Sequence, residues 1–378
     1  KIKKIEIFSW CFFDFANSSY ATVVLTAIYP VFFVNYISPV GKGDFFWGIT
    51  IGIANLFVVV LSPILGTSSD IHASKKKFLV FSTIGCVIFT ALLYFPDKSE
   101  FCFSGMLVMF SCLFFSLTEN FISAFLPEIS NHKNIGKISG YAWGIGYLGG
   151  IFSLVICLLI IKSTNSIIGV KLSMVIVAFF FILTALPAFI FLKERSPKKV
   201  RSLKKNYMLE SFSELYRNLR DLKANKNLFI FLLSFFFYSS GISVVIAFSA
   251  IYAKFELGFS QEHLIIFVLV VNFLACIGAL IFGFIQDKIG AKKTILITLI
   301  SWCVLIPLIY IAKTKLIFFI LGSFTGIVLG SSQSASRAII GILTRKGRFG
   351  EDYGLWGLAG KAAAIVGSFS FGAVTYLF

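Results

Sequence analysis

Charged residues are scarce in this sequence of 378 residues. Asp, Glu, Lys and Arg make up only 13 % of the chain, whereas hydrophobic residues make up 58 %. A soluble domain carries about 25 % charged residues, and a chain with half that share cannot cover a surface that faces water. The composition therefore argues against an ordinary soluble protein and favours one whose outer surface is covered by lipid.

Histidine is rare, and the cysteines lack the spacing of a metal or redox motif. The three histidines fall in or beside separate predicted loops, and no two of the seven cysteines form a Cys-x-x-Cys pair. This pattern predicts neither a disulfide framework nor a zinc site. A Ser-His-Asp arrangement, a Walker loop and a nucleotide-binding domain are also missing from the sequence. We therefore expect no enzyme, no catalytic residue, no cofactor and no primary pump.

Long apolar runs are abundant instead. A helix that crosses a bilayer needs about 20 mostly apolar residues. By this measure the sequence predicts an all-α membrane protein with eleven spans, near 7–37, 45–65, 77–95, 101–127, 138–161, 171–193, 227–253, 262–286, 293–311, 316–340 and 353–378. The first residue is Lys1 and the last lies inside an apolar run, so we expect a piece of a longer protein.

The distribution of cations predicts the orientation. Of the 34 Lys and Arg residues, 25 fall in segments on one side of these spans, 7 on the other and 2 within spans. The side with more cations is normally cytoplasmic, and it includes the N-terminus. The net charge of +17 is thus explained by topology, and we expect a lipid bilayer rather than nucleic acid as the partner.

One long polar segment divides the chain. It predicts an N-terminal bundle of six helices over 1–193, a basic cytoplasmic linker over 194–226 and five helices of a second bundle over 227–378. Within the linker, apolar residues recur at helical spacing over 209–222. This pattern is typical of an amphipathic helix on the membrane surface, although a solvated linker helix would also fit it.

A short motif occurs once in each half. Gly66 and Asp70 form a Gly-x-x-x-Asp pattern ahead of a lysine cluster, in the predicted loop between spans two and three. Gly283 and Asp287 repeat it between spans eight and nine, followed by Lys288, Gly290, Lys292 and Lys293. Two copies at equivalent places indicate that the two halves are related.

This repeat resembles the inner-loop motif of the major facilitator superfamily. The first copy departs from it, with Ile71, Ala73 and Ser74 in place of a cation, a glycine and a basic residue. The resemblance implies two pseudo-symmetric bundles of six helices, so that the twelfth helix is absent from this chain. It also implies that Asp70 and Asp287 cap a neighbouring helix and latch the inner side closed.

Longer segments resemble the vacuole-effluxer-like branch, which includes autophagy-related protein 22 and its bacterial relatives. They lie at 10–22, 124–129, 139–150, 186–194, 330–337 and 353–367. The resemblance implies a secondary transporter that moves a small organic solute by alternating access, with amino acid efflux as the first expectation. It places the chain in a bacterial inner membrane or a vacuole-type membrane. A lipid flippase or scramblase, or a non-transporting receptor of the same fold, is the alternative.

Ionisable residues inside spans are costly and indicate function. Asp14 and Glu119 lie in the first half, whereas Arg337 and Lys361 lie in the second, all at similar depth. They could pair across the halves as an inner gate, hold a charged solute or a coupling proton in a central cavity, or pair within one half. Polar residues of the same spans are candidates for the cavity lining or for helix packing: Asn17, Tyr20, Asn120 and Gln333.

Overall fold

The computed structural model describes residues 3–164, 166–195, 225–255 and 257–377, together with Ser213 and Tyr216. Within these ranges the chain forms helices and no strand. The first bundle comprises α1 (Lys4–Tyr20), η1 (Ala21–Ala27), α2 (Tyr29–Phe32), η2 (Phe33–Ile37), α3 (Gly43–Ile71), α4 (Lys75–Leu92), α5 (Phe101–Ser123), α6 (Leu126–Ile129), α7 (Ile135–Ser163) and α8 (Ser166–Phe191). The second comprises α10 (Lys226–Phe255), α11 (Gln261–Ile289), α12 (Ala291–Ile311), α13 (Lys315–Leu343) and α14 (Phe349–Leu377).

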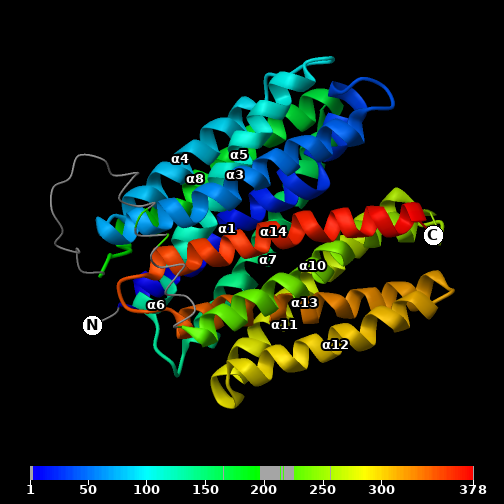
Figure 1. Cartoon of the computed structure of the whole chain (residues 1–378). Coiled ribbons are helices and arrows are strands. Elements are labelled where there is room, and N and C mark those ends of the chain that lie inside the picture. The colour runs from blue at the N-terminus through cyan, green and yellow to red at the C-terminus, as the bar shows by residue number, and fades with distance from the viewer. Residues whose placement is uncertain are drawn as a thin grey trace.

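Nine segments of the described chain are long and apolar enough to cross a membrane. The two further spans expected from the sequence correspond to α4 and α14. Three lysines open α4, and α14 contains Glu351, Asp352 and Lys361. The structure nevertheless places both helices in the bundles alongside the other nine (Figure 1).

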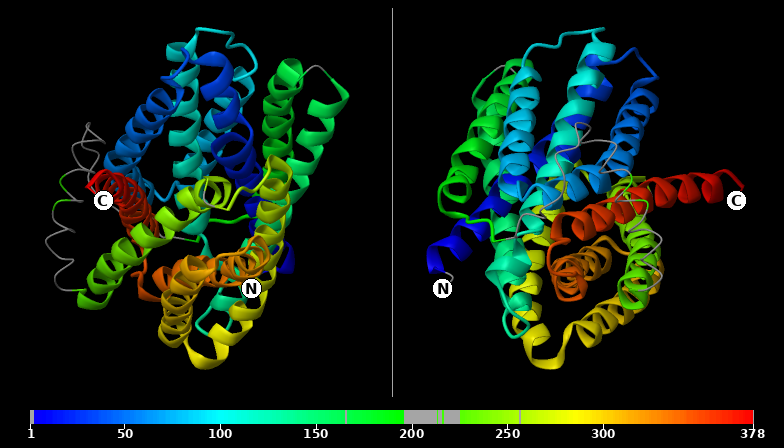
Figure 2. Two further views of the ribbon diagram at one scale, coloured as in Figure 1. Left: turned by 90° about the vertical axis from the view of Figure 1, so that its right-hand side faces the viewer. Right: turned by 60° about the vertical axis from the view of Figure 1, so that its left-hand side comes forward.

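The two bundles meet along two pairs of helices. α7 of the first bundle packs on α11 of the second, and α14 of the second packs on α3 of the first. Figures 1 and 2 show α14 running between the two bundles, from the end of the molecule that holds α6 to the C-terminus. The N-terminus and the short helix α6 lie at the opposite end from the C-terminus (Figure 1). We call this the latch end, because Asp70 and Asp287 lie there.

The packing is apolar outside and partly polar inside. Large side chains such as Phe81, Phe179 and Ile300 are more than half exposed, whereas many Ser and Thr hydroxyls are buried between helices. Most of these hydroxyls donate to a carbonyl of the preceding turn, as Ser82 and Thr83 do on α4. This arrangement suits a chain whose outer surface is solvated by lipid.

The first span is not a uniform α-helix, which the sequence analysis did not anticipate. Its middle is π-helical over Ala21–Ala27, and Ile28 donates its backbone N–H to Val23 five residues earlier. Pro30 follows at the start of α2 and has no N–H to continue the preceding ladder. The wider π turns therefore accommodate the proline within a continuous span.

The placement of the repeated motif in loops is wrong. α3 continues to Ile71 and α11 continues to Ile289, so both Gly-x-x-x-Asp patterns lie in the last turns of helices. This difference matters because a helix fixes the direction of the Asp side chain. Almost all of the predicted linker lies outside the described residues, and its amphipathic helix and the exact domain boundaries stay predictions.

Candidate functional site

Two of the predicted charges meet at the interface of the bundles. Nη1 of Arg337 on α13 lies 2.6 Å from Oδ2 of Asp14 on α1. The two side chains are only 3 % and 7 % exposed. A buried ion pair of this kind needs good geometry and further hydrogen bonds to offset the desolvation of both charges. The pair therefore joins the two halves at one point in the molecule.

The guanidinium of Arg337 has those additional partners. Its Cζ lies 4.8 Å from the ring centre of Trp10 and 5.1 Å from that of Trp143. Its Nε and Nη2 donate to the hydroxyl and the carbonyl of Ser139, at 3.3 and 3.1 Å. Tyr353 of α14 donates its hydroxyl to the Arg337 carbonyl at 2.9 Å. Arg337 is thus enclosed by groups from α1, α7 and α14, and cation–π contacts strengthen when they are desolvated.

The other two charges are placed differently. Glu119 of α5 and Lys361 of α14 are half-buried, and neither forms an ion pair with another described residue. They interact electrostatically across the interface, and Glu119 also lies in the field of Asp14 and Arg337. The charged atoms of Glu119 and Lys361 are consequently available to bind a third group.

Asn17 provides a further hydrogen-bonding side chain, one helical turn after Asp14. Its side chain is 8 % exposed, and its Oδ1 accepts no hydrogen bond from any described group. Buried polar atoms nearly always have a partner. An unfilled acceptor beside the interfacial charges marks a place where a bound solute or water would gain a hydrogen bond.

Gln333 lies on the second-bundle side of this region. It lines a cavity of about 40 Å³ between α10 and α13, together with Tyr238 and four serines. The hydroxyl of Tyr238 lies 2.7 Å from that of Ser336. A cavity of this volume holds water rather than an organic solute, and it lies within the second bundle.

Two predicted residues serve packing. Tyr20 is fully buried inside the first bundle, where its hydroxyl pairs with Ser111 at 2.7 Å and its ring stacks on Phe115. Asn120 donates to the hydroxyl of Ser62 on α3. It also lies so close to Gly357 of α14 that a Cβ there would be 2.3 Å from its Oδ1. Tyr20 is therefore away from the interfacial charges, whereas Asn120 helps to join α3, α5 and α14.

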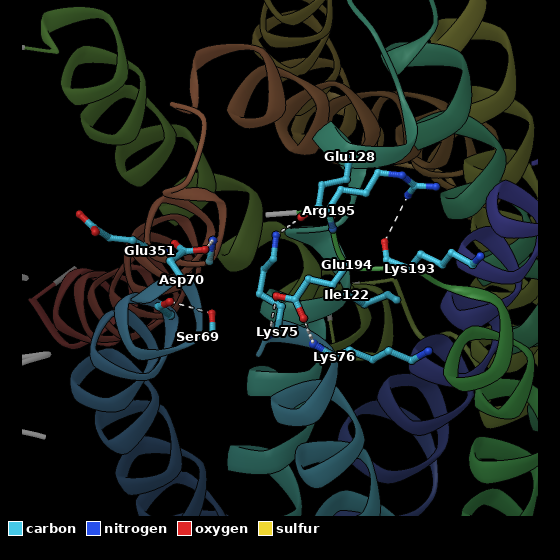
Figure 3. Close-up of polar contacts among 12 residues, drawn as sticks. Ser69, Asp70, Lys75, Lys76, Ile122, Glu128, Lys193, Glu194, Arg195 and Glu351 are labelled. Atoms are coloured by element: carbon cyan, nitrogen blue, oxygen red, sulfur yellow. Dashed lines mark hydrogen bonds and ion pairs between the residues drawn. The ribbon is translucent and has the colours of Figure 1, made fainter. Parts of the chain in front are cut away.

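The first motif copy caps a helix of the opposite bundle. Asp70 accepts backbone N–H groups of Gly350 at 2.9 Å and Glu351 at 2.8 Å, in the first turn of α14. The first N–H groups of a helix have no partner within it, and the helix dipole favours an anion there. Asp70 is only 2 % exposed, and Figure 3 shows it directed at Glu351. We call this contact the first latch.

The second motif copy does the same in the other direction. Asp287 accepts the backbone N–H groups of Gly136 at 2.8 Å and Lys137 at 2.9 Å, in the first turn of α7. Gly290 adopts a φ of +91°, which only glycine tolerates easily, and links α11 to α12. The remaining motif residues, Lys288, Lys292 and Lys293, are exposed. We call the contact of Asp287 the second latch.

Each motif glycine allows the two backbones to touch. A Cβ at Gly66 would lie 2.3 Å from the carbonyl oxygen of Gly350, and one at Gly283 would lie 2.9 Å from that of Gly136. Small residues at helix crossings permit such close approach within membranes. Glycine and aspartate therefore act together, because the close crossing brings the carboxylate to the helix end that it caps.

An ion-pair network beside the first latch was missed by the sequence analysis. Nζ of Lys75 pairs with Glu128 of α6, and both side chains are at most 2 % exposed. Glu194 accepts the backbone N–H of Lys75 at 2.9 Å, and the N–H of Arg195 donates to Glu128 at 2.6 Å. Figure 3 shows these four residues close together at the latch end. We call this set the clasp.

The clasp reaches both the N-terminus and the second bundle. The guanidinium of Arg195 lies 2.5 Å from the carboxylate of Glu6 on α1. Nζ of Lys75 also lies 4.9 Å from the ring centre of Phe349, the first residue of α14. Lys75 and Glu128 are 53 residues apart, and Lys75 and Glu194 are 119 apart. No local spacing in the sequence signals such a contact.

A family match covers most of the chain. The model of the family described as "Vacuole effluxer Atg22 like" matches residues 45–376. The chain belongs to this family. It is 28 % identical to the MFS-type transporter YxiO of Bacillus subtilis over 95 % of this chain and 86 % of that protein. It is 20 % identical to autophagy-related protein 22 of Kluyveromyces lactis over 85 % of this chain and 71 % of that one.

Solved structures agree on the fold of this Atg22-like chain. FucP, a major facilitator transporter in the outward conformation, superposes with a TM-score of 0.76 at 12 % identity, over 98 % of this chain and 91 % of that one. A bacterial homologue of ferroportin in the outward-facing state gives 0.69 at 14 % identity, over 99 % and 92 %. The chain therefore has the major facilitator fold with two pseudo-symmetric bundles. Together with the family match and the similarity to YxiO, this makes it a multi-pass membrane transporter of the major facilitator type.

Proposed function

We propose that this Atg22-like protein is a secondary transporter that moves a small organic solute by alternating access, with amino acids as the first candidates. The observation that carries the proposal is the meeting of acids from one bundle with bases from the other at a single interface. A zwitterion presents both charges, so it can bridge Glu119 and Lys361 when the bundles close around it. Solute sites of such transporters lie between the two repeats near the middle of the bilayer.

The two charge pairs have different roles in this proposal. Asp14 and Arg337 form the inner gate, because Arg337 is already enclosed by two Trp rings and Ser139. Glu119 and Lys361 bind the solute, because neither is engaged in a direct ion pair with a described residue. Glu119 is also our candidate for a coupling proton, since a carboxyl group beside a binding site can exchange its proton as the site opens.

The two latches hold the cytoplasmic side closed in this proposal. Each one caps a helix of the opposite bundle, so the bundles cannot separate at the latch end while both caps persist. Two of the similar solved structures are described as outward, which supports a state closed at this end. The excess of cations puts the N-terminus in the cytoplasm, in a bacterial inner membrane or a vacuole-type membrane.

Reconstituted vesicles test the solute site. We expect counterflow of labelled amino acids to saturate in vesicles with the full protein, and to fall at least tenfold in Glu119→Gln and in Lys361→Met. Lys315→Gln is the matched control, because Lys315 is exposed at the far end of α13 and bonds only the Gly258 carbonyl among described groups. Normal counterflow in both site variants would falsify the charged site. Movement of labelled phospholipid without amino acid counterflow would favour a flippase.

A neutral double variant tests the gate. Asp14→Asn alone leaves Arg337 buried without its anion, and we expect it to abolish flux and reduce folding. Asp14→Asn/Arg337→Gln removes both charges and should recover substantial flux, since a gate contact needs no charge to bind solute. A double variant that folds normally but binds no solute would instead place Asp14 and Arg337 in the solute site.

A further inference from the structure

A large open groove lies on the outer face of α4 at the latch end. It has a volume of about 670 Å³ and is lined by Ala73, Lys76, Lys77, Val80, Phe81 and Ile84, with Glu194 at its rim. α4 packs on α5, α8 and α3 of its own bundle, and none of the interfacial charges lines the groove.

The rim of this groove has surplus positive charge. Glu194 is its one acidic lining residue, and both carboxylate oxygens accept backbone N–H groups, from Lys75 at 2.9 Å and from Lys76 at 3.4 Å. Nζ of Lys76 donates to the Leu192 carbonyl at 2.8 Å. Lys77 is exposed and forms no ion pair with a described residue. An anion at the rim would therefore meet two ammonium groups and no free carboxylate.

Below the rim, α4 presents a continuous apolar stripe. Phe81, Ile84 and Ile88 follow Lys77 at helical spacing and are 66 %, 45 % and 51 % exposed. Eleven residues of helix rise about 16 Å. Half the hydrocarbon thickness of a bilayer is about 15 Å. The stripe thus has the length of one acyl chain and begins at the level of the lysines.

We propose that this groove binds an anionic phospholipid, with its phosphate at Lys76 and Lys77 and one acyl chain along Phe81, Ile84 and Ile88. Basic pockets at the cytoplasmic membrane surface are suited to acidic head groups. The linker that follows Arg195 in the sequence is a poor alternative occupant, because its sequence over 198–205 carries five cations of the same sign as the rim. The site adjoins the clasp, since Lys75 and Lys76 are consecutive and share Glu194.

Native mass spectrometry of the whole chain in neutral detergent tests the site. The probes are dioleoyl phosphatidylglycerol and dioleoyl phosphatidylcholine, which share acyl chains and differ in net charge. We expect phosphatidylglycerol to remain bound at least tenfold more tightly. Each lysine removed should weaken it about fivefold, so Lys76→Gln/Lys77→Gln should lower the affinity about 25-fold. Phe81→Ala should weaken it severalfold without a change of charge.

The second bundle supplies a matched control. Lys292 and Lys293 are an exposed pair at the start of α12, after the second motif copy. We expect Lys292→Gln/Lys293→Gln to change binding less than twofold. An equal loss in this control, or equal binding of the two lipids, would overturn the site. Full displacement of the lipid by millimolar inorganic phosphate, with no effect of Phe81→Ala, would show a free-anion site instead.

Discussion

The first and second latches use the same chemistry in different surroundings. Asp70 and Asp287 each accept two backbone N–H groups at 2.8–2.9 Å from the first turn of a helix in the other bundle. Asp70 is almost fully buried and adjoins the clasp, whereas Asp287 is half-buried next to exposed lysines. Burial raises the strength of a charged hydrogen bond and also the loss when one partner is removed. We therefore expect the first latch to contribute more than the second to the free energy that keeps the latch end closed.

The sequence motif suggests the opposite order. The second copy matches the superfamily pattern almost completely, whereas the first lacks the cation after Asp70, the glycine at position 73 and the basic residue at 74. The first copy nevertheless keeps the motif lysine at position 75, and in the structure this lysine is buried against Glu128. Agreement with a motif thus indicates where the contact lies but not how strongly it holds.

Among the variants that distinguish the two latches, removal of Lys75 should lower the stability of the protein most. Lys75→Met leaves the Glu128 carboxylate buried without its cation, so the free energy of unfolding should fall by about 3–5 kcal/mol. Lys292→Met, at the matching position of the second copy, should change it by no more than about 0.5 kcal/mol, because Lys292 is exposed. Denaturant unfolding in detergent micelles measures both.

A double variant controls for loss of packing at this site. Lys75→Met/Glu128→Gln removes both buried charges and should recover more than half of the lost stability. A loss in Lys292→Met as large as that in Lys75→Met would contradict the proposed difference between the latches.

Substitutions of the motif glycines should cause the next largest loss of stability. Gly66→Ala brings a Cβ against backbone of Gly350, which cannot move aside easily, and should cost about 1–3 kcal/mol. Gly283→Ala meets the backbone at 2.9 Å rather than 2.3 Å and should cost less. Gly52 on the same helix as Gly66 has nothing within 4 Å of its Cβ position, so Gly52→Ala should be neutral or stabilising by up to about 1 kcal/mol.

Thermal unfolding of the three glycine variants in detergent micelles tests this order. If Gly52→Ala destabilises as much as Gly66→Ala, then helix conformation rather than the close crossing sets the cost.

The capping aspartates should have smaller effects on stability but clear effects on closure. Replacing a helix-capping Asp by Ala costs about 0.5–2 kcal/mol. We expect Asp70→Ala near the upper end, because it leaves two buried N–H groups unpaired, and Asp287→Ala near the lower end. Cys11 is a natural reporter, since it is 3 % exposed at the latch end, with Sγ 3.8 Å from the Ile138 carbonyl.

Alkylation of Cys11, followed by mass spectrometry, should therefore accelerate more in Asp70→Ala than in Asp287→Ala. Cys102 is already exposed and serves as the internal control for reagent activity. Equal acceleration in the two variants would mean that the latches contribute equally to closure.

The sequence was sufficient to predict the class of the fold. Apolar runs of the right length predict the spans, including α4 and α14. The division of buried charges between the halves also follows directly from composition along the chain. Which acid meets which base does not, because Asp14 and Arg337 are 323 residues apart and only the packing of α1, α7 and α13 brings them together.

Local departures from α-helical geometry could not be predicted from the sequence. The π-helical turns of the first span depend on how Pro30 is accommodated against the rest of the bundle, and apolar periodicity does not distinguish them from α-helix. Tyr20 shows the same limit, because a tyrosine in a span fits either a cavity or a core. The structure pairs its hydroxyl with Ser111 in the core, and the periodicity gave no sign of that partner.

The smallest expected effect on stability concerns the position where the two motif copies have different residues and different backbone φ angles. Ala73 has a φ of +46° at the place where the second copy has Gly290 with a φ of +91°. A left-handed conformation costs an L-residue roughly 1–2 kcal/mol. Glycine loses about 0.5–1 kcal/mol in chain entropy relative to alanine. Ala73→Gly should therefore stabilise the protein by about 0.5 kcal/mol in denaturant unfolding, and Gly290→Ala should destabilise it by more. If Ala73→Gly destabilises instead, the methyl group of Ala73, which lines the α4 groove, contributes packing that outweighs its backbone strain.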